Sequence, residues 1–258
     1  MPYQAIRYEV TAGMALITLA RPEVMNALNT QMRAELTVAL KRAGAEARVV
    51  VLTGAGRAFC SGQDLGDGTS VAGLDLERVL RDEYEPMLHA INDAPVPVIA
   101  AVNGVAAGAG ANLALACDVV IASEKAAFLQ AFTRIGLIPD AGGTYFLPRQ
   151  IGMARAMGAA LFAERISARQ AADWGMIWEA VPEVDFDHHW RARAAHLANG
   201  PTLAYRAVRQ ALRASPENGF TAQLELEARL QGACGTTRDF GEGVMAFIEK
   251  REPQFEGR

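Results

Sequence analysis

Residues 97–117 read PVIAAVNGVAAGAGANLALAC and contain a strand, a turn and a helix in close succession. The apolar run Pro97–Val102 predicts a buried strand, the glycine- and alanine-rich stretch 103–110 a tight turn, and Ala111–Cys117 a short helix of small residues. Val119–Ala122 predicts the next strand. Strands that alternate with helices indicate crossover units, and therefore an α/β fold.

The same alternation occurs upstream of this stretch. Met14–Leu19 is a β-type run, and from Asn26 onward apolar residues recur every four positions, as in a helix. The apolar run Val49–Leu52 predicts a strand that is buried on both faces. We expect a loop over residues 57–70, which are rich in Gly, Ser and Asp, and a helix over residues 74–92.

The C-terminal part of the chain is predicted to be helical. Strand signals stop after about Asp185, and helical spacing continues in four segments: Trp190–Asn199, Thr202–Ala214, Phe220–Ala233 and Arg238–Arg251. We therefore divide the chain into a core over residues 1–195 and a helical region over residues 196–258. The apolar faces of these helices are expected to pack on a partner subunit.

Composition and charge narrow the possible partners. The chain has 258 residues, of which 51% are hydrophobic and 21% charged, the balance of a soluble globular protein. A net charge of −4 argues against nucleic acid as the main partner. The longest apolar stretch, Val96–Ala116, is interrupted by Asn103 and Asn112, which argues against a membrane span.

Cysteine usage and the N-terminal sequence indicate the compartment. Cys60, Cys117 and Cys234 are an odd number of cysteines without the spacing of a metal site, so we expect reduced thiols and no bound metal. The first residues contain no basic-then-apolar signal sequence. Together these features predict a cytoplasmic protein.

The stretch 136–144, GLIPDAGGT, places one carboxylate, Asp140, among small and apolar residues. Pro139 and the pair Gly142–Gly143 predict a turn there. A carboxylate in apolar surroundings can have a raised pKa and carry a proton at neutral pH. The alternative is that Asp140 only caps the helix expected to start near Gly143.

Two other stretches offer backbone N–H groups at turns beside strands. One is the stretch 60–65 and the other is the stretch 104–110, which leads into a predicted helix. Small residues let a ligand approach the backbone, and two N–H groups that converge on one oxygen form an oxyanion hole. Tight packing of helix on strand is the alternative explanation for these glycines, whose spacing does not match the dinucleotide-binding pattern.

Several motifs, in order along nearly the whole chain, resemble the crotonase (enoyl-CoA hydratase/isomerase) superfamily. They are Arg21-Pro22 with Asn26-Ala27-Leu28, residues 57–65 (RAFCSGQDL), residues 103–110 (NGVAAGAG), Cys117-Asp118, Gly142-Gly143-Thr144 and residues 247–255 (FIEKREPQF). The resemblance implies a crotonase-like spiral core of ββα turns, followed by helices that build a homotrimer or a dimer of trimers.

The resemblance also implies an acyl-CoA thioester as substrate, with CoA as part of that substrate and no separate cofactor. The backbone N–H groups of Gln63 and Ala109 would then hold the thioester oxygen. The CoA path would be lined by Gln63, Asp64, Leu65 and Gly66. Lys250 would reach the CoA phosphates of this or a neighbouring subunit, and a solvated helix face is the alternative reading of that lysine.

Two departures from the family pattern matter for the chemistry. Hydratases of the family use two glutamates, and the matching positions here are Asn112 and Phe132, which cannot exchange protons at neutral pH. Asp140 stands where several isomerases of the superfamily carry their catalytic aspartate. We therefore assign Asp140 as a single acid/base, Asn112 as a polar positioning group or spacer within the substrate site, and Phe132 as an apolar wall suited to a ring.

Within the superfamily the chain most resembles the branch that isomerises ring-1,2-epoxyphenylacetyl-CoA in phenylacetate degradation and also moves a Δ3 double bond to Δ2. One carboxylate suffices for such a proton shift. The alternative within enzymes is a broad-specificity enoyl-CoA hydratase that uses Asp140 and a bound water. The alternative of another class is a non-catalytic CoA- or RNA-binding relative, against which the acidic pI of about 5.7 and the two turns both argue.

Overall fold

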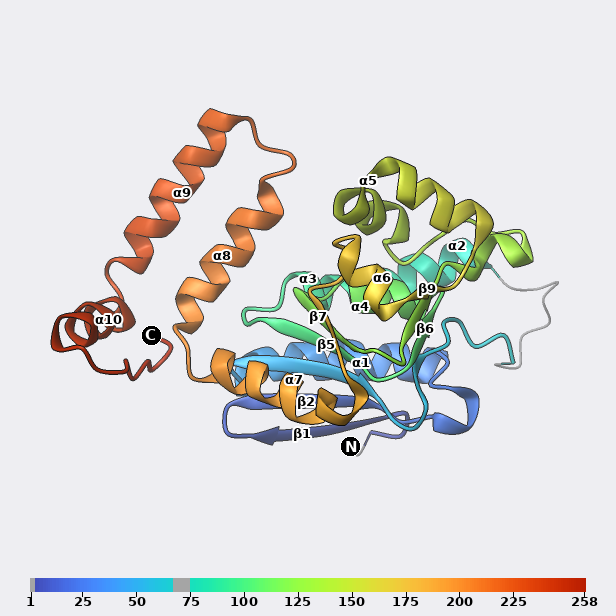
Figure 1. The fold of residues 1–258 in the computed structure, drawn as a ribbon, viewed down its shortest axis with the longest axis horizontal. Helices are drawn as coiled ribbons and strands as arrows, with labels where there is room; N and C mark the ends of the chain where they lie inside the picture. Colours follow the sequence, from blue (N-terminus) through green and yellow to red (C-terminus); the bar gives the residue numbers. More distant parts are fainter. Residues whose placement is uncertain (1–2, 67–74) are drawn as a thin grey trace.

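In the computed structural model, which describes residues 3–66 and 75–258, the strands form two sheets (Figure 1). The first has the order β1 (Ile6–Thr11), β2 (Met14–Leu19), β3 (Val49–Gly54), β5 (Val98–Val102), β7 (Val119–Ser123) and β10 (Glu179–Val181). The second has the order β4 (Ala58–Cys60), β6 (Val105–Ala107), β8 (Ala127–Leu129) and β9 (Ile166–Ser167). Neighbouring strands are parallel, except for the pairs β1–β2 and β8–β9.

Helices connect and cover these sheets (Figure 1). The core contains α1 (Thr30–Glu46), α2 (Leu76–Val79), α3 (Glu85–Asn92), α4 (Ala109–Leu115), α5 (Gly143–Phe162), α6 (Ala168–Asp173) and α7 (Glu183–Ala198). A π-helical turn, η3 (Leu80–Tyr84), joins α2 to α3, and short 3-10 turns occur at η1 (Pro22–Val24) and η4 (Ala131–Ile135). The last helices are α8 (Thr202–Ala214), α9 (Phe220–Cys234) and α10 (Arg238–Glu249).

The chain repeats one pattern three times: β3 and β4, β5 and β6, and β7 and β8 each contribute one strand to the first sheet and the next to the second. A helical segment follows each pair, so the core is a spiral of ββα turns, as expected. Two local predictions were wrong, because β4 lies inside the expected loop 57–70 and β6 inside the expected turn 103–110. Strands of three residues are too short to show a period, and only their neighbours in the sheet define them.

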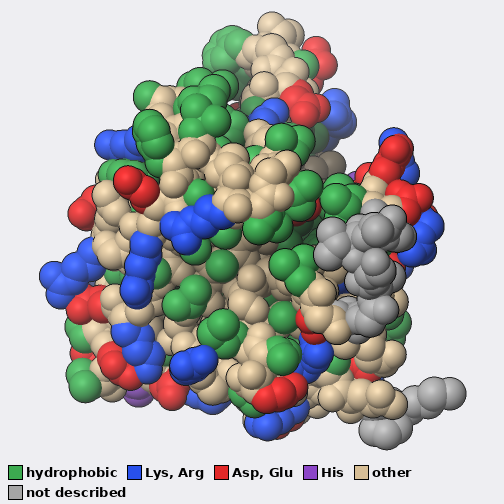
Figure 2. Space-filling view, turned by 90° about the vertical axis from the view of Figure 1, so that its right-hand side faces the viewer, with side chains coloured by type: hydrophobic (Ala, Val, Ile, Leu, Met, Phe, Trp, Pro, Cys, Tyr) green, Lys and Arg blue, Asp and Glu red, His purple; other side chains and the backbone are tan. Residues whose placement is uncertain are grey.

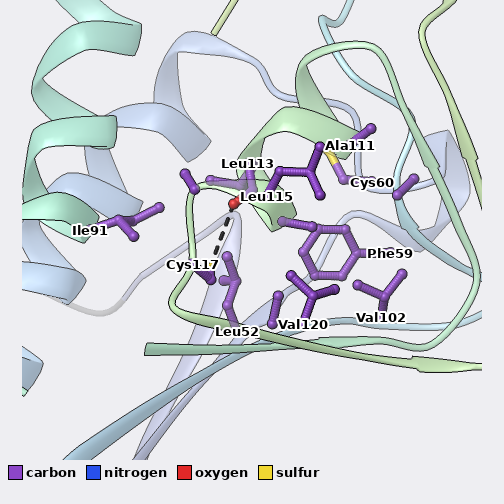
Figure 3. Close-up of a cluster of buried hydrophobic side chains, with 14 of the residues drawn as sticks. Leu52, Phe59, Cys60, Ile91, Val102, Ala111, Leu113, Leu115, Cys117 and Val120 are labelled. Atoms are coloured by element: carbon purple, nitrogen blue, oxygen red, sulfur yellow. Dashed lines mark hydrogen bonds between the residues drawn. The ribbon is translucent and has the colours of Figure 1, made fainter. Parts of the chain in front are cut away.

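The hydrophobic core lies between these layers, around α4. Every residue of α4 is buried, and its small side chains let it pack closely against the second sheet. Figure 3 shows this region, where Phe59 and Leu52 lie among buried aliphatic side chains and the Cys117 thiol donates to the carbonyl oxygen of Leu113. The opposite face of the first sheet is covered by α7, whose Trp190 is 2% exposed.

The helices α8, α9 and α10 project away from the core (Figure 1). An apolar groove of about 930 Å³ lies between them, and its lining comes from these helices, the turns that join them and the C-terminal tail. Asp118 ties α8 to the core because its carboxylate pairs with Arg209 and Arg213, each at 2.7 Å. The predicted boundary at residue 195 falls in the last turn of α7, and the division into two domains stays a prediction.

Exposed apolar side chains also occur on α5, where Met153, Met157, Leu161 and Phe162 are each more than half exposed. On the face drawn in Figure 2, hydrophobic side chains are spread over the upper part. Among the described helices, none is both long and apolar enough to cross a membrane. Leu74, the first residue of the helix predicted over residues 74–92, lies outside the described residues.

Candidate active site

The turn after β4 holds the peptide of Gln63 beside Leu28. The Leu28 N–H donates to the Gly62 carbonyl oxygen at 2.7 Å, and the Asp64 N–H donates to the Leu28 carbonyl oxygen at 3.2 Å. In a parallel bridge of this kind, the N–H of the central residue points to the other side of its strand. The N–H of Gln63 therefore points away from Leu28.

The start of α4 lies beside this turn. A Cβ on Gly62, which has φ +95°, would lie 3.4 Å from the backbone nitrogen of Ala109. Ala109 is the first residue of α4, so its N–H has no acceptor within the helix. The peptides of Gln63 and Ala109 thus bring two N–H groups into one region, an arrangement that can hold one oxygen atom with a partial negative charge.

The glycines of the stretch 104–110 serve two different purposes. A Cβ on Gly104 or Gly110 would lie 2.2 Å and 2.4 Å, respectively, from a carbonyl oxygen of the neighbouring segment, so both are required for close packing. Gly108 has φ +52° and ψ −127°, a backbone conformation that side chains oppose, and it turns the chain from β6 into α4. Close packing therefore explains Gly104 and Gly110, while an oxyanion hole at this turn stays a prediction.

Asp140 lies in the turn before α5, with a partly buried carboxylate. Its Oδ1 is buried and has no hydrogen-bond partner within the described part of the chain. Burial raises the pKa of Asp140 from 3.8 to about 6, against an opposing effect of its own backbone N–H. The helix-cap alternative is wrong, because the N-cap of α5 is Gly142 and no side chain caps that helix.

Asn112 of α4 holds the backbone of this turn. Its Nδ2 donates to the carbonyl oxygen of Asp140 at 2.7 Å, and its Oδ1 accepts from Nε2 of Gln130 at 2.8 Å. The side chain of Asn112 is fully buried, so these bonds support its positioning role, while a direct contact with substrate stays a prediction. The sequence did not single out Gln130, which follows β8 and carries no recognisable motif.

The conformation of this turn requires a glycine at position 143 and a strained backbone at Ala141. A Cβ on Gly143 would lie 2.4 Å from Nδ2 of Asn112, so any larger residue would push this amide away. Ala141 has φ +48°, in the left-handed region that residues other than glycine rarely adopt. The bond from Asn112 and the bond from the Gly143 N–H to the Asp140 carbonyl oxygen at 2.8 Å stabilise this turn.

Phe132 and Cys60 flank the two N–H groups. Phe132 is 7% exposed, and its ring edge would lie 3.7 Å from a Cβ on Gly108, so it forms an apolar wall beside that turn. Burial raises the pKa of the Cys60 thiol to about 12. A thiol that stays protonated at neutral pH is a poor nucleophile.

The residues predicted to line the CoA path differ in their surroundings. Asp64 pairs with Arg21 at 2.7 Å. Burial by itself would raise the pKa of Asp64, but the hydrogen bonds from Arg21 and from the Gly66 N–H lower this pKa below its usual value. Leu65 and Gly66 are exposed. Lys250 is the C-cap residue of α10, one of the three helices that project from the core (Figure 1). Within one chain it therefore lies away from the site, and its contact with CoA stays a prediction.

Two sheets built by a spiral of ββα turns are the architecture of the crotonase fold. A family model described as Enoyl-CoA hydratase/isomerase matches residues 9–258. An enoyl-CoA hydratase of known structure from Bacillus anthracis superposes with a TM-score of 0.91 at 35% identity, over 99% of this chain and 100% of that one. The chain belongs to the enoyl-CoA hydratase/isomerase family.

Two relatives of this chain are named for different activities of the family. A Rhodobacter capsulatus protein named "Probable enoyl-CoA hydratase" is 69% identical over the full length of both chains. The Escherichia coli K12 protein named "1,2-epoxyphenylacetyl-CoA isomerase" is 45% identical over 96% of this chain and 97% of that protein. The comparisons thus show that the chain belongs to a family of hydratases and isomerases, and they include relatives named for each activity.

Proposed function

We propose that the chain is an acyl-CoA isomerase in which Asp140 is the single acid/base and the N–H groups of Gln63 and Ala109 form the oxyanion hole. The observation that carries this proposal is the state of Asp140: a carboxylate whose buried Oδ1 has no partner among the described residues and whose pKa is raised to about 6. Such a group is ionised at neutral pH, yet basic enough to accept a proton from carbon that is acidified by a thioester.

The proposed reaction moves one proton along the acyl chain. With the thioester oxygen held by the two N–H groups, Asp140 removes a proton from the γ carbon of a 3-enoyl-CoA, and the electrons shift into the dienolate. The protonated Asp140 then returns the proton to the α carbon, which leaves a 2-enoyl-CoA. Each N–H group that meets the developing oxyanion contributes about 3 kcal/mol in comparable sites.

Hydration needs a second group to activate water, and the described residues of this region argue against it. The amide of Asn112 is engaged with the backbone of Asp140 and with Gln130, and Phe132 is apolar. Hydration is nevertheless the second candidate activity, because the 69% identical relative is named as a hydratase.

For the acyl group we propose a six-membered carbon ring, as in 1,2-epoxyphenylacetyl-CoA, and a place in phenylacetate degradation. The apolar wall of Phe132 and the printed name of the Escherichia coli relative support this choice. Homotrimer formation through α8, α9 and α10 belongs to the same proposal, with their apolar groove as support. Location in the cytoplasm stays a prediction.

The test is an assay of wild type and Asp140→Asn on a 3-enoyl-CoA, crotonyl-CoA and 1,2-epoxyphenylacetyl-CoA. We expect wild type to isomerise the first and third, and Asp140→Asn to lose at least a thousandfold in turnover while still binding the thioester. The matched control is Asp173→Asn, which changes an exposed aspartate of α6. Unchanged turnover in Asp140→Asn, or hydration of crotonyl-CoA far faster than isomerisation, would refute the proposal. A protein that binds CoA esters without either reaction would belong to the non-catalytic class.

A further inference from the structure

The side chain of Gln63 is held by two donors from distant parts of the chain. Its Oε1 accepts from Nη1 of Arg33, on α1, at 2.9 Å and from the hydroxyl of Tyr84, in η3, at 2.6 Å. The three residues are 30 and 21 positions apart in sequence, so only the fold brings them together. Gln63 is the residue whose backbone N–H is proposed as an oxyanion-hole donor.

The arginine of this cluster is buried and its charge is balanced. Arg33 is 2% exposed, and its Nη2 and Nε donate to Oε2 of Glu83 at 2.6 and 3.0 Å. Its Nη1 also donates to the carbonyl oxygen of Leu28 at 2.5 Å. Because Leu28 forms the backbone bridge to Gln63, one guanidinium fixes both sides of that bridge. Burying a charged guanidinium costs desolvation free energy, and a guanidinium whose nitrogens all donate hydrogen bonds is held in one orientation.

Tyr84 reaches Gln63 through an unusual piece of helix. Leu80–Tyr84 is a π-helical turn between α2 and α3, and such turns are rare and often occur at functional sites. Widening the helix here changes the direction in which the following residues point. Tyr84 is 3% exposed, and burial raises its pKa well above the ordinary value, so its hydroxyl remains a neutral donor.

The other side of the same turn is held by a second arginine. Nη1 of Arg21 donates to Oδ2 of Asp64 and to the carbonyl oxygen of Ala27, both at 2.7 Å. The peptide between Gly62 and Asp64 is therefore fixed by its backbone bridge, by Arg21 through Asp64, and by the Arg33–Tyr84 pair through the side chain of Gln63. A donor in an oxyanion hole works only while its N–H points at the oxygen. Because this turn contains Gly62, a flexible residue with a left-handed φ of +95°, hydrogen bonds from outside the turn are needed to fix its conformation.

We infer that Arg33 and Tyr84 are positioning residues, which act through the Gln63 side chain to aim the Gln63 N–H at the thioester oxygen. The inference rests on the proposed oxyanion hole. It does not depend on which group moves the proton, because polarisation of the carbonyl precedes any proton transfer.

The first test is Tyr84→Phe, which removes one hydrogen bond and keeps the ring. We expect kcat for isomerisation to fall about tenfold with KM changed less than twofold, because a loosened donor is felt most in the transition state. The matched control is Tyr8→Phe, which removes a tyrosine hydroxyl bonded to Glu46 at 2.8 Å on an exposed edge and is expected to leave kcat unchanged. Arg33→Lys, a second variant that keeps the charge and loses the fork, is expected to shift kcat in the same direction.

A spectroscopic measurement distinguishes a change in the orientation of the Gln63 N–H from a general loss of stability of the fold. In the infrared difference spectrum of bound hexanoyl-CoA labelled with 13C at the carbonyl, wild type should lower the C=O stretch relative to free thioester. Tyr84→Phe should recover part of that shift towards the free value, and Tyr8→Phe should not. Hexanoyl-CoA has no double bond to move, so the measurement remains valid even if the isomerase proposal fails.

A double-mutant cycle with Gln63→Met completes the design, because methionine keeps the length of the side chain and its backbone N–H but removes Oε1. If Tyr84 acts through Gln63, the double variant should be no slower than Gln63→Met alone. Multiplying losses would show that Tyr84 acts on substrate directly and would overturn the inference. An unchanged carbonyl stretch and unchanged kcat in both Tyr84→Phe and Arg33→Lys would overturn it as well.

Discussion

Replacing Asp140 with asparagine is expected to stabilise the folded protein at pH 7.5 while it removes catalysis. The change keeps the shape of the side chain and deletes a charge that the folded state solvates poorly. The pKa of Asp140 lies at about 6 in the folded protein and at 3.8 without the fold, because the carboxylate is desolvated and its buried Oδ1 has no partner within residues 3–66 and 75–258.

The magnitude follows from that difference in pKa. Each pKa unit is worth about 1.4 kcal/mol, so the full difference corresponds to about 3 kcal/mol. Solvent reaches the exposed part of the carboxylate and screens the effect, which leaves about 1–2 kcal/mol of stabilisation in Asp140→Asn. For a chain of this size, that gain raises the melting temperature by about 3–6 °C.

The size of this stabilisation depends on pH. The folded state binds the Asp140 proton more tightly than the unfolded state, so wild-type stability falls as the pH rises from about 4 to about 6. The advantage of Asp140→Asn should therefore be largest above pH 6 and shrink towards pH 4.5. Asp173→Asn, at an exposed position, should show neither the gain nor the trend.

The assay is urea unfolding followed by circular dichroism at pH 4.5 and 7.5, at one protomer concentration so that any association affects both proteins alike. Isomerase activity is measured on the same samples. An Asp140→Asn variant that is less stable than wild type at pH 7.5, or equally stabilised at both pH values, would show that desolvation does not set the properties of this carboxylate.

Three further predictions follow from the geometry. The kcat/KM for isomerisation should rise about tenfold per pH unit up to about pH 6 and then level off, because Asp140 must be ionised to accept a proton; a flat profile between pH 5 and 8 would exclude it as the base. Gly143→Ala places a Cβ 2.4 Å from Nδ2 of Asn112 and should lower kcat at least tenfold, with about 1–3 kcal/mol of destabilisation in urea. The control Gly158→Ala lies further along α5, beyond its kink at Gly152, where no described atom comes within 4 Å of the added Cβ, and it should lose neither activity nor stability. Asp118→Ala leaves Arg209 and Arg213 without their carboxylate and should cost about 2–3 kcal/mol of unfolding free energy, because these ion pairs are partly buried; a loss as small as that of Asp173→Ala would show that they do not stabilise the fold.

The fold was predictable where elements are long or strongly apolar. The strands β2, β3, β5 and β7 were expected close to their observed bounds, and α8 was expected over the residues it occupies, Thr202–Ala214. The strands β1, β4, β6, β8, β9 and β10 were not expected. Most of them have two or three residues, which define no period, and β1 carries charged side chains at the edge of the sheet.

The sequence by itself determined the order of the motifs, the position of Asp140 before a glycine pair, and the loss of carboxylates at Asn112 and Phe132. These are properties of residue identity and spacing, which the chain carries in any conformation. They were enough to indicate the superfamily and to place the acid in the turn before α5.

Only the tertiary structure decided how these residues work together. Asn112 was expected to be a polar positioning group or spacer, and the fold shows that it binds the backbone of Asp140, 28 residues away. The raised pKa of Asp140, the approach of Gly62 to Ala109, and the hydrogen bonds from Arg33 and Tyr84 to Gln63 likewise depend on distances in space. Burial and hydrogen bonding between distant segments exist only after folding, so no pattern along the chain contains them.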